Sequence, residues 1–125
     1  MKLILLSLLT LSITMAEAQI KNVNERNGQA YIELEDAYRS GSAPWISLRE
    51  ARLVSWNSQV VLVIQNINGP NGGSARLYDY KGNIKPESDL GRVPMNDSRI
   101  NLNAAGVTVT RNGNTYQYDL SGKLK

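Results

Sequence analysis

The sequence predicts an all-β domain built from hairpins, either an antiparallel β-sandwich or a small barrel-like fold of about eight strands. Three observations lead to this prediction. Short runs of β-branched and aromatic residues alternate with Gly and Asn. Asn-Gly pairs at 27–28 and 112–113 favour tight hairpin turns, because a type I′ turn needs positive φ at both central residues. Residues 19–125 lack the 3.6-residue hydrophobic period of a long amphipathic helix.

The first hairpin is expected around the Asn27-Gly28 turn. A two-residue loop pairs Val23 with Ile32 and Lys21 with Leu34. Directly paired residues share one face of a sheet, so this face is apolar apart from Lys21. The hairpin therefore has one buried face and one solvated face.

A second hairpin is expected around Asn57-Ser58, where a two-residue loop would pair Leu53 with Leu62. The run Val60–Ile64 is apolar at every position and does not alternate. Such a run is typical of a strand that is buried on both faces. We therefore expect this strand at the centre of the fold.

Other segments near this hairpin have competing or irregular interpretations. Residues 47–50 read Ser-Leu-Arg-Glu, a capping box, so a short helix within 47–55 is the alternative to a strand. The stretches 66–74 and 86–97 are rich in Gly, Pro, Asn and Asp. They are predicted to be loops, and long loops often carry binding residues.

The last hairpin is the clearest. The Asn112-Gly113 turn pairs Val109 with Tyr116 and Val107 with Tyr118 on one apolar face. The opposite face is polar throughout and carries Thr108, Thr110, Thr115 and Gln117. This separation of the two faces supports the register, since a one-residue slip would exchange them.

A weak internal repeat has a spacing of about 40 residues. Residues 78–85 read Tyr-Asp-Tyr-Lys-Gly-Asn-Ile-Lys, and residues 118–125 read Tyr-Asp-Leu-Ser-Gly-Lys-Leu-Lys. Asp-x-x-Gly favours a type I turn that ends in a left-handed Gly. A repeat of this length built from hairpins makes a three-fold β-prism-like arrangement the alternative fold.

The N-terminal residues predict export. Lys2 precedes an apolar stretch from Leu3 to Met15, and Ala16-Glu17-Ala18 matches a small-x-small cleavage site. We therefore interpret 1–18 as a signal peptide and 19–125 as a single β-domain of a secreted or periplasmic protein. The apolar stretch is shorter than the roughly 20 residues of a transmembrane helix, so no membrane span is expected after cleavage.

The amino-acid composition excludes several kinds of catalytic site and metal site. The chain has neither His nor Cys, which removes Ser-His-Asp and Cys-His catalysis, disulfides, and His or thiolate metal sites. The net charge is only +3, and the basic residues are scattered rather than clustered. A nucleic-acid partner is therefore not expected. We predict no catalytic residue, no metal and no cofactor.

Five residues are candidate ligand-binding residues. Arg76, Tyr78 and Tyr80 alternate with Ala75 and Leu77, so they form an exposed aromatic and basic strip if Leu77 faces the core. Trp45 follows Pro44 in an expected loop, and Trp56 precedes a turn. Such aromatic residues stack on sugar rings or contact proteins. Full coverage of the strand on both faces is the competing interpretation.

These observations lead to three hypotheses about function. The first is a non-enzymatic, exported binding or assembly module that contacts another envelope or extracellular protein through sheet edges and long loops. The alternative is a carbohydrate-binding, lectin-like module that uses the five candidate residues. The third is a small hydrolase that uses the acidic cluster Glu33, Glu35 and Asp36. The partner is a protein or a glycan, and the oligomeric state stays open.

Overall fold

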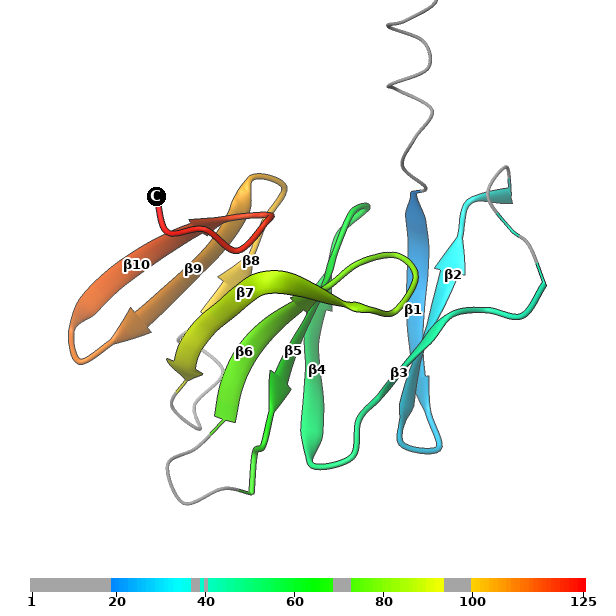
Figure 1. Ribbon diagram of the computed structural model, residues 1–125, viewed down its shortest axis with the longest axis horizontal. Helices are drawn as coiled ribbons and strands as arrows, with labels where there is room; N and C mark the ends of the chain where they lie inside the picture. Colours follow the sequence, from blue (N-terminus) through cyan, green and yellow to red (C-terminus); the bar gives the residue numbers. More distant parts are fainter. Residues whose placement is uncertain (1–18, 37–38, 40, 69–72, 94–99) are drawn as a thin grey trace, which may run out of the picture.

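The computed structural model describes residues 19–36, 39, 41–68, 73–93 and 100–125, and this part of the chain contains no α-helix. The signal-peptide prediction for 1–18 lies outside the described residues. Within these described ranges, ten strands form three antiparallel sheets (Figure 1), where the sequence led us to expect about eight strands. The all-β fold built from hairpins is confirmed.

The three sheets follow one another along the chain. Sheet A has the order β1 (Ile20–Arg26), β2 (Gln29–Leu34), β3 (Trp45–Ser47). Sheet B has the order β4 (Ala51–Trp56), β5 (Val61–Gln65), β6 (Gly73–Tyr78), β7 (Ile84–Val93). Sheet C has the order β10 (Asn114–Asp119), β9 (Gly106–Arg111), β8 (Ile100–Leu102).

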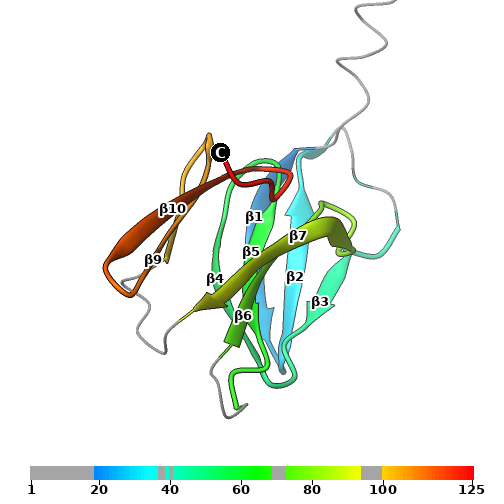
Figure 2. The ribbon, with the colours of Figure 1, turned by 60° about the vertical axis from the view of Figure 1, so that its left-hand side comes forward.

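Sheet B lies between the other two sheets, as Figures 1 and 2 both show. Val61 and Val63 project from one face of β5 into a first core shared with sheet A. Leu62 and Ile64 project from the other face into a second core shared with sheet C. The expected double-sided burial of this strand is confirmed. Full burial of each such side chain contributes roughly 1.5–3 kcal/mol.

The layered arrangement also decides between the two predicted architectures. Each buried hydrophobic cluster joins sheet B to one outer sheet, and sheet B contributes to both clusters. In a three-fold prism the three sheets would instead surround one common core. The structure is therefore two β-sandwiches that share their central sheet, and the prism alternative does not apply to the described residues.

The two Asn-Gly turns form as predicted. Asn27 has φ 52° and Gly28 has φ 75°, and the second turn has φ 49° at Asn112 and 82° at Gly113. The β9–β10 register pairs Tyr116 with Val109, as the sequence predicts. These turns succeed because Asn and Gly tolerate the left-handed conformation that the turn demands.

The predicted pairing of Lys21 with Leu34 is wrong. A bulge between Ile20 and Asn22 places Ile20 opposite Leu34 instead. The extra residue turns the Lys21 side chain to solvent and brings Ile20, which is 3% exposed, into the first core. The bulge thus removes the one charged residue from the apolar face.

The predicted register of the β4–β5 hairpin is also wrong, by one residue. Leu53 pairs with Val63, not Leu62, because the connection is longer than two residues and a bulge between Leu53 and Ser55 takes up part of the resulting shift. The Asn57 side chain explains this difference, since its Oδ1 accepts hydrogen bonds from the backbone N–H of Gln59 at 2.8 Å and of Val60 at 2.9 Å. Such an Asx turn replaces the tight type I′ turn.

Two further expectations are corrected around sheet B. Residues 51–56 form strand β4, so the capping-box helix within 47–55 does not form. The expected loop 86–97 instead begins within strand β7, and the expected loop 66–74 ends inside β6. Pro86 fits β7 because this strand lies at the edge of sheet B, where a missing N–H can face solvent.

The repeated Asp-x-x-Gly segments form the same turn twice. Asp79 Oδ1 accepts from the backbone N–H of Lys81 at 2.9 Å and of Asn83 at 3.0 Å. Asp119 Oδ1 makes the equivalent bonds to Ser121 and Lys123, and it also accepts from the Ser121 hydroxyl. The Ser121 hydroxyl bond, with the backbone bonds, lowers the pKa of Asp119 below its usual value.

Arg111 links the edge of sheet B to sheet C. Its Nε donates to the Arg92 carbonyl at 2.8 Å, and its Nη2 donates to the Leu90 carbonyl and to the Tyr118 hydroxyl, the latter at 3.2 Å. The guanidinium also lies 4.8 Å from the centroid of the Tyr116 ring. These contacts satisfy carbonyls of strand β7 that would otherwise face outward from the sheet edge.

The double-sided burial of sheet B predicts that polar substitutions on either face destabilise the fold. Val63→Thr in the first core and Val60→Thr in the second each bury an unpaired hydroxyl. We expect each to lower the free energy of unfolding by about 1–3 kcal/mol in urea denaturation. Thr108→Val, on the polar face of β9, is the control and should change stability by less than about 0.5 kcal/mol. A near-neutral result for either valine would show that its face is not buried.

The Arg111 contacts predict a second stability effect. Arg111→Ala removes hydrogen bonds from a charged donor to two carbonyls, so we expect a loss of about 1.5–3 kcal/mol in the same assay. Arg92→Ala is the matched control, because it removes an exposed cation yet keeps the carbonyl that Arg111 binds. Equal effects of the two variants would argue against the link.

Candidate functional site

The predicted strip of Arg76, Tyr78 and Tyr80 does not lie open on the surface. Leu77 faces the second core, so Arg76 and Tyr78 occupy the opposite face of β6, as the alternation predicts. Sheet A covers part of that face. Tyr78 is only 9% exposed and belongs to the first core, and Tyr80 packs against the same core from the β6–β7 turn.

The two tryptophans differ in their surroundings. Trp56 ends β4 and packs half-buried against the first core. Trp45 begins the short edge strand β3 rather than lying in a loop, and its side chain is 51% exposed. Trp45 is therefore the candidate aromatic residue that is most available to a ligand.

The structure brings Trp45 and Tyr78 together at one concavity of about 420 Å³, which we call the Trp45 groove. It lies between strand β3 and the strands of sheet B. Its lining residues are Trp45, Ile46, Ser47, Arg49, Ala51, Gln65, Asn66, Tyr78 and Gly82. The half-exposed residue Trp45 thus borders a concavity that is also lined by residues with hydroxyl, amide and guanidinium groups.

A hydrogen bond fixes the polar side of the Trp45 groove. Gln65 Nε2 donates to the Tyr78 hydroxyl. Burial raises the pKa of Tyr78 above its usual value, although the Gln65 bond and the charge of Arg76 act in the opposite direction. The hydroxyl thus stays protonated and can donate at neutral pH. Arg76 lies beside Tyr78 on the same face, and its Nε is buried with no hydrogen-bond partner among the described residues.

Gly82 allows the Trp45 backbone to lie close to the β6–β7 turn. Gly82 has φ 83°, and a Cβ at this position would lie 2.7 Å from the Trp45 carbonyl oxygen. A side chain here would therefore push strand β3 away, in addition to straining the turn. On the other side, Trp45 pairs with Tyr31 of β2. The backbone beneath the indole is thus fixed from both sides.

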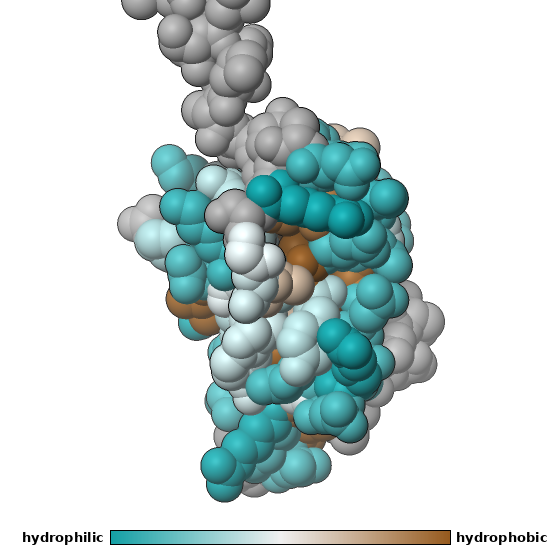
Figure 3. All heavy atoms as spheres, turned by 90° about the vertical axis from the view of Figure 1, so that its right-hand side faces the viewer, coloured by the Kyte–Doolittle hydropathy of each residue, from teal (hydrophilic) through white to brown (hydrophobic). Residues whose placement is uncertain are grey.

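A second concavity of about 490 Å³, the β2 groove, lies along β2 and is also lined by residues 41–44, which precede β3. Its lining residues are Asn24, Arg26, Tyr31, Ile32, Glu33, Leu34, Arg39, Gly41, Ser42, Ala43, Pro44, Tyr80 and Lys81. Figure 3 shows a hollow on this side of the molecule with hydrophobic atoms at its floor and hydrophilic atoms around it.

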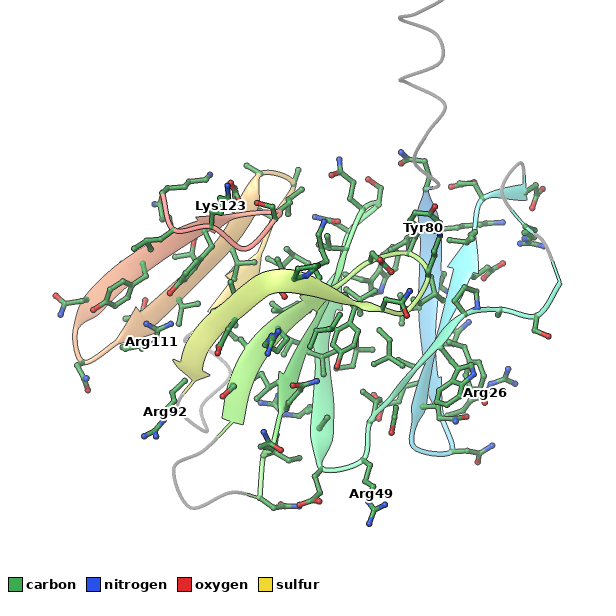
Figure 4. The ribbon with its side chains drawn as sticks, viewed as in Figure 1. Arg26, Arg49, Tyr80, Arg92, Arg111 and Lys123 are labelled. Carbon is green, nitrogen blue, oxygen red and sulfur yellow. The ribbon has the colours of Figure 1, made fainter. Side chains whose placement is uncertain are left out.

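The β2 groove follows its strands lengthwise. Arg26 lies next to the β1–β2 turn, whereas Tyr80 lies toward the other end of the two strands (Figure 4). Beyond Tyr31 the edge of β2 is only loosely covered, since Ile32 N–H donates to the Pro44 carbonyl at 2.8 Å and Pro44 has no N–H to return the bond.

Two residues of the acidic cluster considered for hydrolysis, Glu33 and Asp36, form ion pairs with Arg39. Arg39 Nη2 lies 2.7 Å from Glu33 Oε2 and 3.3 Å from Asp36 Oδ1. These ion pairs occupy carboxylate oxygens that would otherwise be free to contact a substrate. Within the described ranges, no three acidic residues are grouped so that they could hold a metal ion.

Sequence reasoning missed the polar half of the Trp45 groove. Gln65 and Asn66 follow the buried β5 run directly, and Arg49 lies in the turn before β4. Polar residues that directly follow a buried strand were a local signal that this end of β5 could line a polar site. Their closeness to Trp45 depends on how sheet A packs on sheet B, and no local pattern contains that information.

No helix among the described residues is long and apolar enough to cross a membrane.

The raised pKa of Tyr78 predicts an alkaline loss of stability. The folded state holds the phenolic proton more tightly than the unfolded chain, whose tyrosine pKa is 10.0. Its contribution is fully present below pH 10.0 and is lost as the pH rises through the folded-state pKa. We expect Tyr78→Phe to reduce the pH dependence of urea unfolding above pH 10.0, relative to the unmodified chain. An identical dependence would contradict the assigned burial.

Comparison with known proteins adds no relative: no family model, no curated protein and no solved structure matches this chain.

Proposed function

We propose that this chain is an exported, non-enzymatic carbohydrate-binding module, and that the Trp45 groove is its binding site. The half-exposed Trp45 indole at the border of a polar groove carries this proposal. Exposure of a large aromatic ring to water is unfavourable when nothing covers it. A pyranose ring would cover it by stacking on the face of the indole.

The rest of the groove supplies what a sugar hydroxyl needs. Gln65, Asn66 and Ser47 offer donors and acceptors, and the Tyr78 hydroxyl is oriented by its bond to Gln65. The volume of about 420 Å³ lies within the usual range for small-ligand sites. The fixed backbone under Trp45 reduces the ordering cost that a mobile loop would add to binding.

A protein partner bound along a sheet edge is the second candidate, and the edges support it less. Arg111 covers two carbonyls of β7, and Lys125 N–H donates to the Gln117 carbonyl beside β10 at 2.8 Å. The edge strands β3 and β8 have only three residues each. Strand addition gains affinity from rows of free backbone groups, and the rows at β3 and β8 are short, whereas those at β7 and β10 are partly covered.

The proposal predicts that glycan binding depends on the Trp45 side chain. We expect an immobilised glycan array to identify ligands, and Trp45→Ala to weaken binding of the best ligand at least about tenfold by isothermal titration calorimetry. Leu124→Ala is the matched control, because it removes an exposed apolar side chain outside the groove. We expect this variant to bind like the unmodified chain.

Two results would contradict the proposal. One is an array without any bound glycan while a stoichiometric protein partner co-purifies with the tagged chain from its native source. The other is glycan binding that Trp45→Ala leaves unchanged in a variant whose urea unfolding midpoint is also unchanged.

A further inference from the structure

The Trp45 groove and the β2 groove adjoin each other. Pro44 lines the β2 groove, and the next residue, Trp45, lines the Trp45 groove. In the β6–β7 turn, Lys81 lines the β2 groove and the next residue, Gly82, lines the Trp45 groove. Gly82 lies against the Trp45 backbone where the two grooves meet. Trp45 also pairs with Tyr31, which lines the β2 groove, so the two side chains share one face of sheet A and a chain-like ligand on Trp45 can continue into this groove.

The β2 groove has an excess of positive charge. Arg26, Arg39 and Lys81 line it, against the single carboxylate of Glu33. Arg39 is neutralised by its pairs with Glu33 and Asp36. Among the described residues, neither Arg26 nor Lys81 forms an ion pair, so two positive charges are available to an anionic ligand.

Aromatic rings in the β2 groove hold these cations rather than offering stacking surfaces. The Arg26 guanidinium carbon lies 4.3 Å from the centroid of the Tyr31 ring, and Lys81 Nζ lies 5.8 Å from that of Tyr80. A cation over a ring occupies the face that a sugar would need, yet it leaves N–H groups free to donate. The β2 groove is thus suited to binding anionic groups of a ligand, whereas the Trp45 groove is suited to stacking with a sugar ring.

From this arrangement we infer that the ligand is an acidic oligosaccharide, with one ring stacked on Trp45 and its carboxylate or sulfate groups bound by Lys81 and Arg26. The inference rests on the proposed function and names the class of glycan. The lengthwise course of the β2 groove fits a chain with repeated charges, because Arg26 lies near the β1–β2 turn and Tyr80, over whose ring Lys81 lies, is toward the other end of the strands (Figure 4).

The test compares ligands that differ only in charge. Tetragalacturonate and its full methyl ester share one backbone, and a sulfated galactan tetrasaccharide distinguishes sulfate from carboxylate. We expect the unmodified chain to bind at least one anionic tetrasaccharide about tenfold more tightly than the ester at low salt. Increasing ionic strength should reduce this preference, because both cations are exposed.

The double variant Arg26→Gln with Lys81→Gln should lose the preference for the anionic ligand and bind the ester as before. Arg92→Gln with Lys123→Gln is the matched control, since it removes the same charge from exposed residues of sheet B and of the segment after β10 (Figure 4). This control should keep the preference for the anionic ligand. Trp45→Ala should weaken the binding of all three ligands.

The outcomes separate the inference from the proposed function. Equal, Trp45-dependent binding of the acid and the ester overturns the acidic class and leaves the carbohydrate-binding module standing. An equal loss in both double variants overturns the assignment to the β2 groove, because general charge attraction would then explain the preference. A failure of every glycan to bind overturns the proposed function itself.

Discussion

The double-sided burial of strand β5 is the constraint on which the architecture depends. A strand with apolar side chains on both faces needs a layer on each side, and sheets A and C provide these layers. Neither outer sheet has such a strand of its own. Each outer sheet instead pairs one apolar face with one polar face, as in β9 and β10. The order of the three layers thus follows from one run of five residues, Val60–Ile64.

Covering sheet B with an outer sheet also creates the candidate site. Sheet A does not extend over the whole face of sheet B, so a concavity stays open at the border beside β3, lined in part by the last residue of β5 and the last residue of β6. Gln65 and Tyr78 lie at this border, and Trp45 reaches it from sheet A. Because Gly82 has no side chain, the β6–β7 turn can approach the Trp45 backbone closely at that point. Residues of the proposed site therefore also take part in the packing of the two sheets.

The parts that the sequence predicted correctly are those that local chemistry decides. The β9–β10 register followed from Asn112-Gly113 because a two-residue turn leaves only one pairing. The β4–β5 register could not be read in this way, because the Asn57 side chain takes the place of the expected turn geometry. The bulge at Lys21 was invisible locally, since only burial against sheet B favours Ile20 over Lys21. The Trp45 groove is lined by three segments that are distant in sequence. Some of its residues could be predicted as ligand-binding candidates, but the contact between the three segments could not be predicted.

The burial of Tyr78 changes which aromatic residue can act on a ligand. A strip of alternating Arg and Tyr on β6 would have been a stacking surface only if sheet A left it open, and sheet A buries Tyr78. Tyr31 and Tyr80 keep exposed surface, but cations lie over their rings. Trp45 has neither limitation, because it is half-exposed and no cation contact involves it among the described residues. Recognition by this ring and its polar neighbours is accordingly the function that we propose for the site.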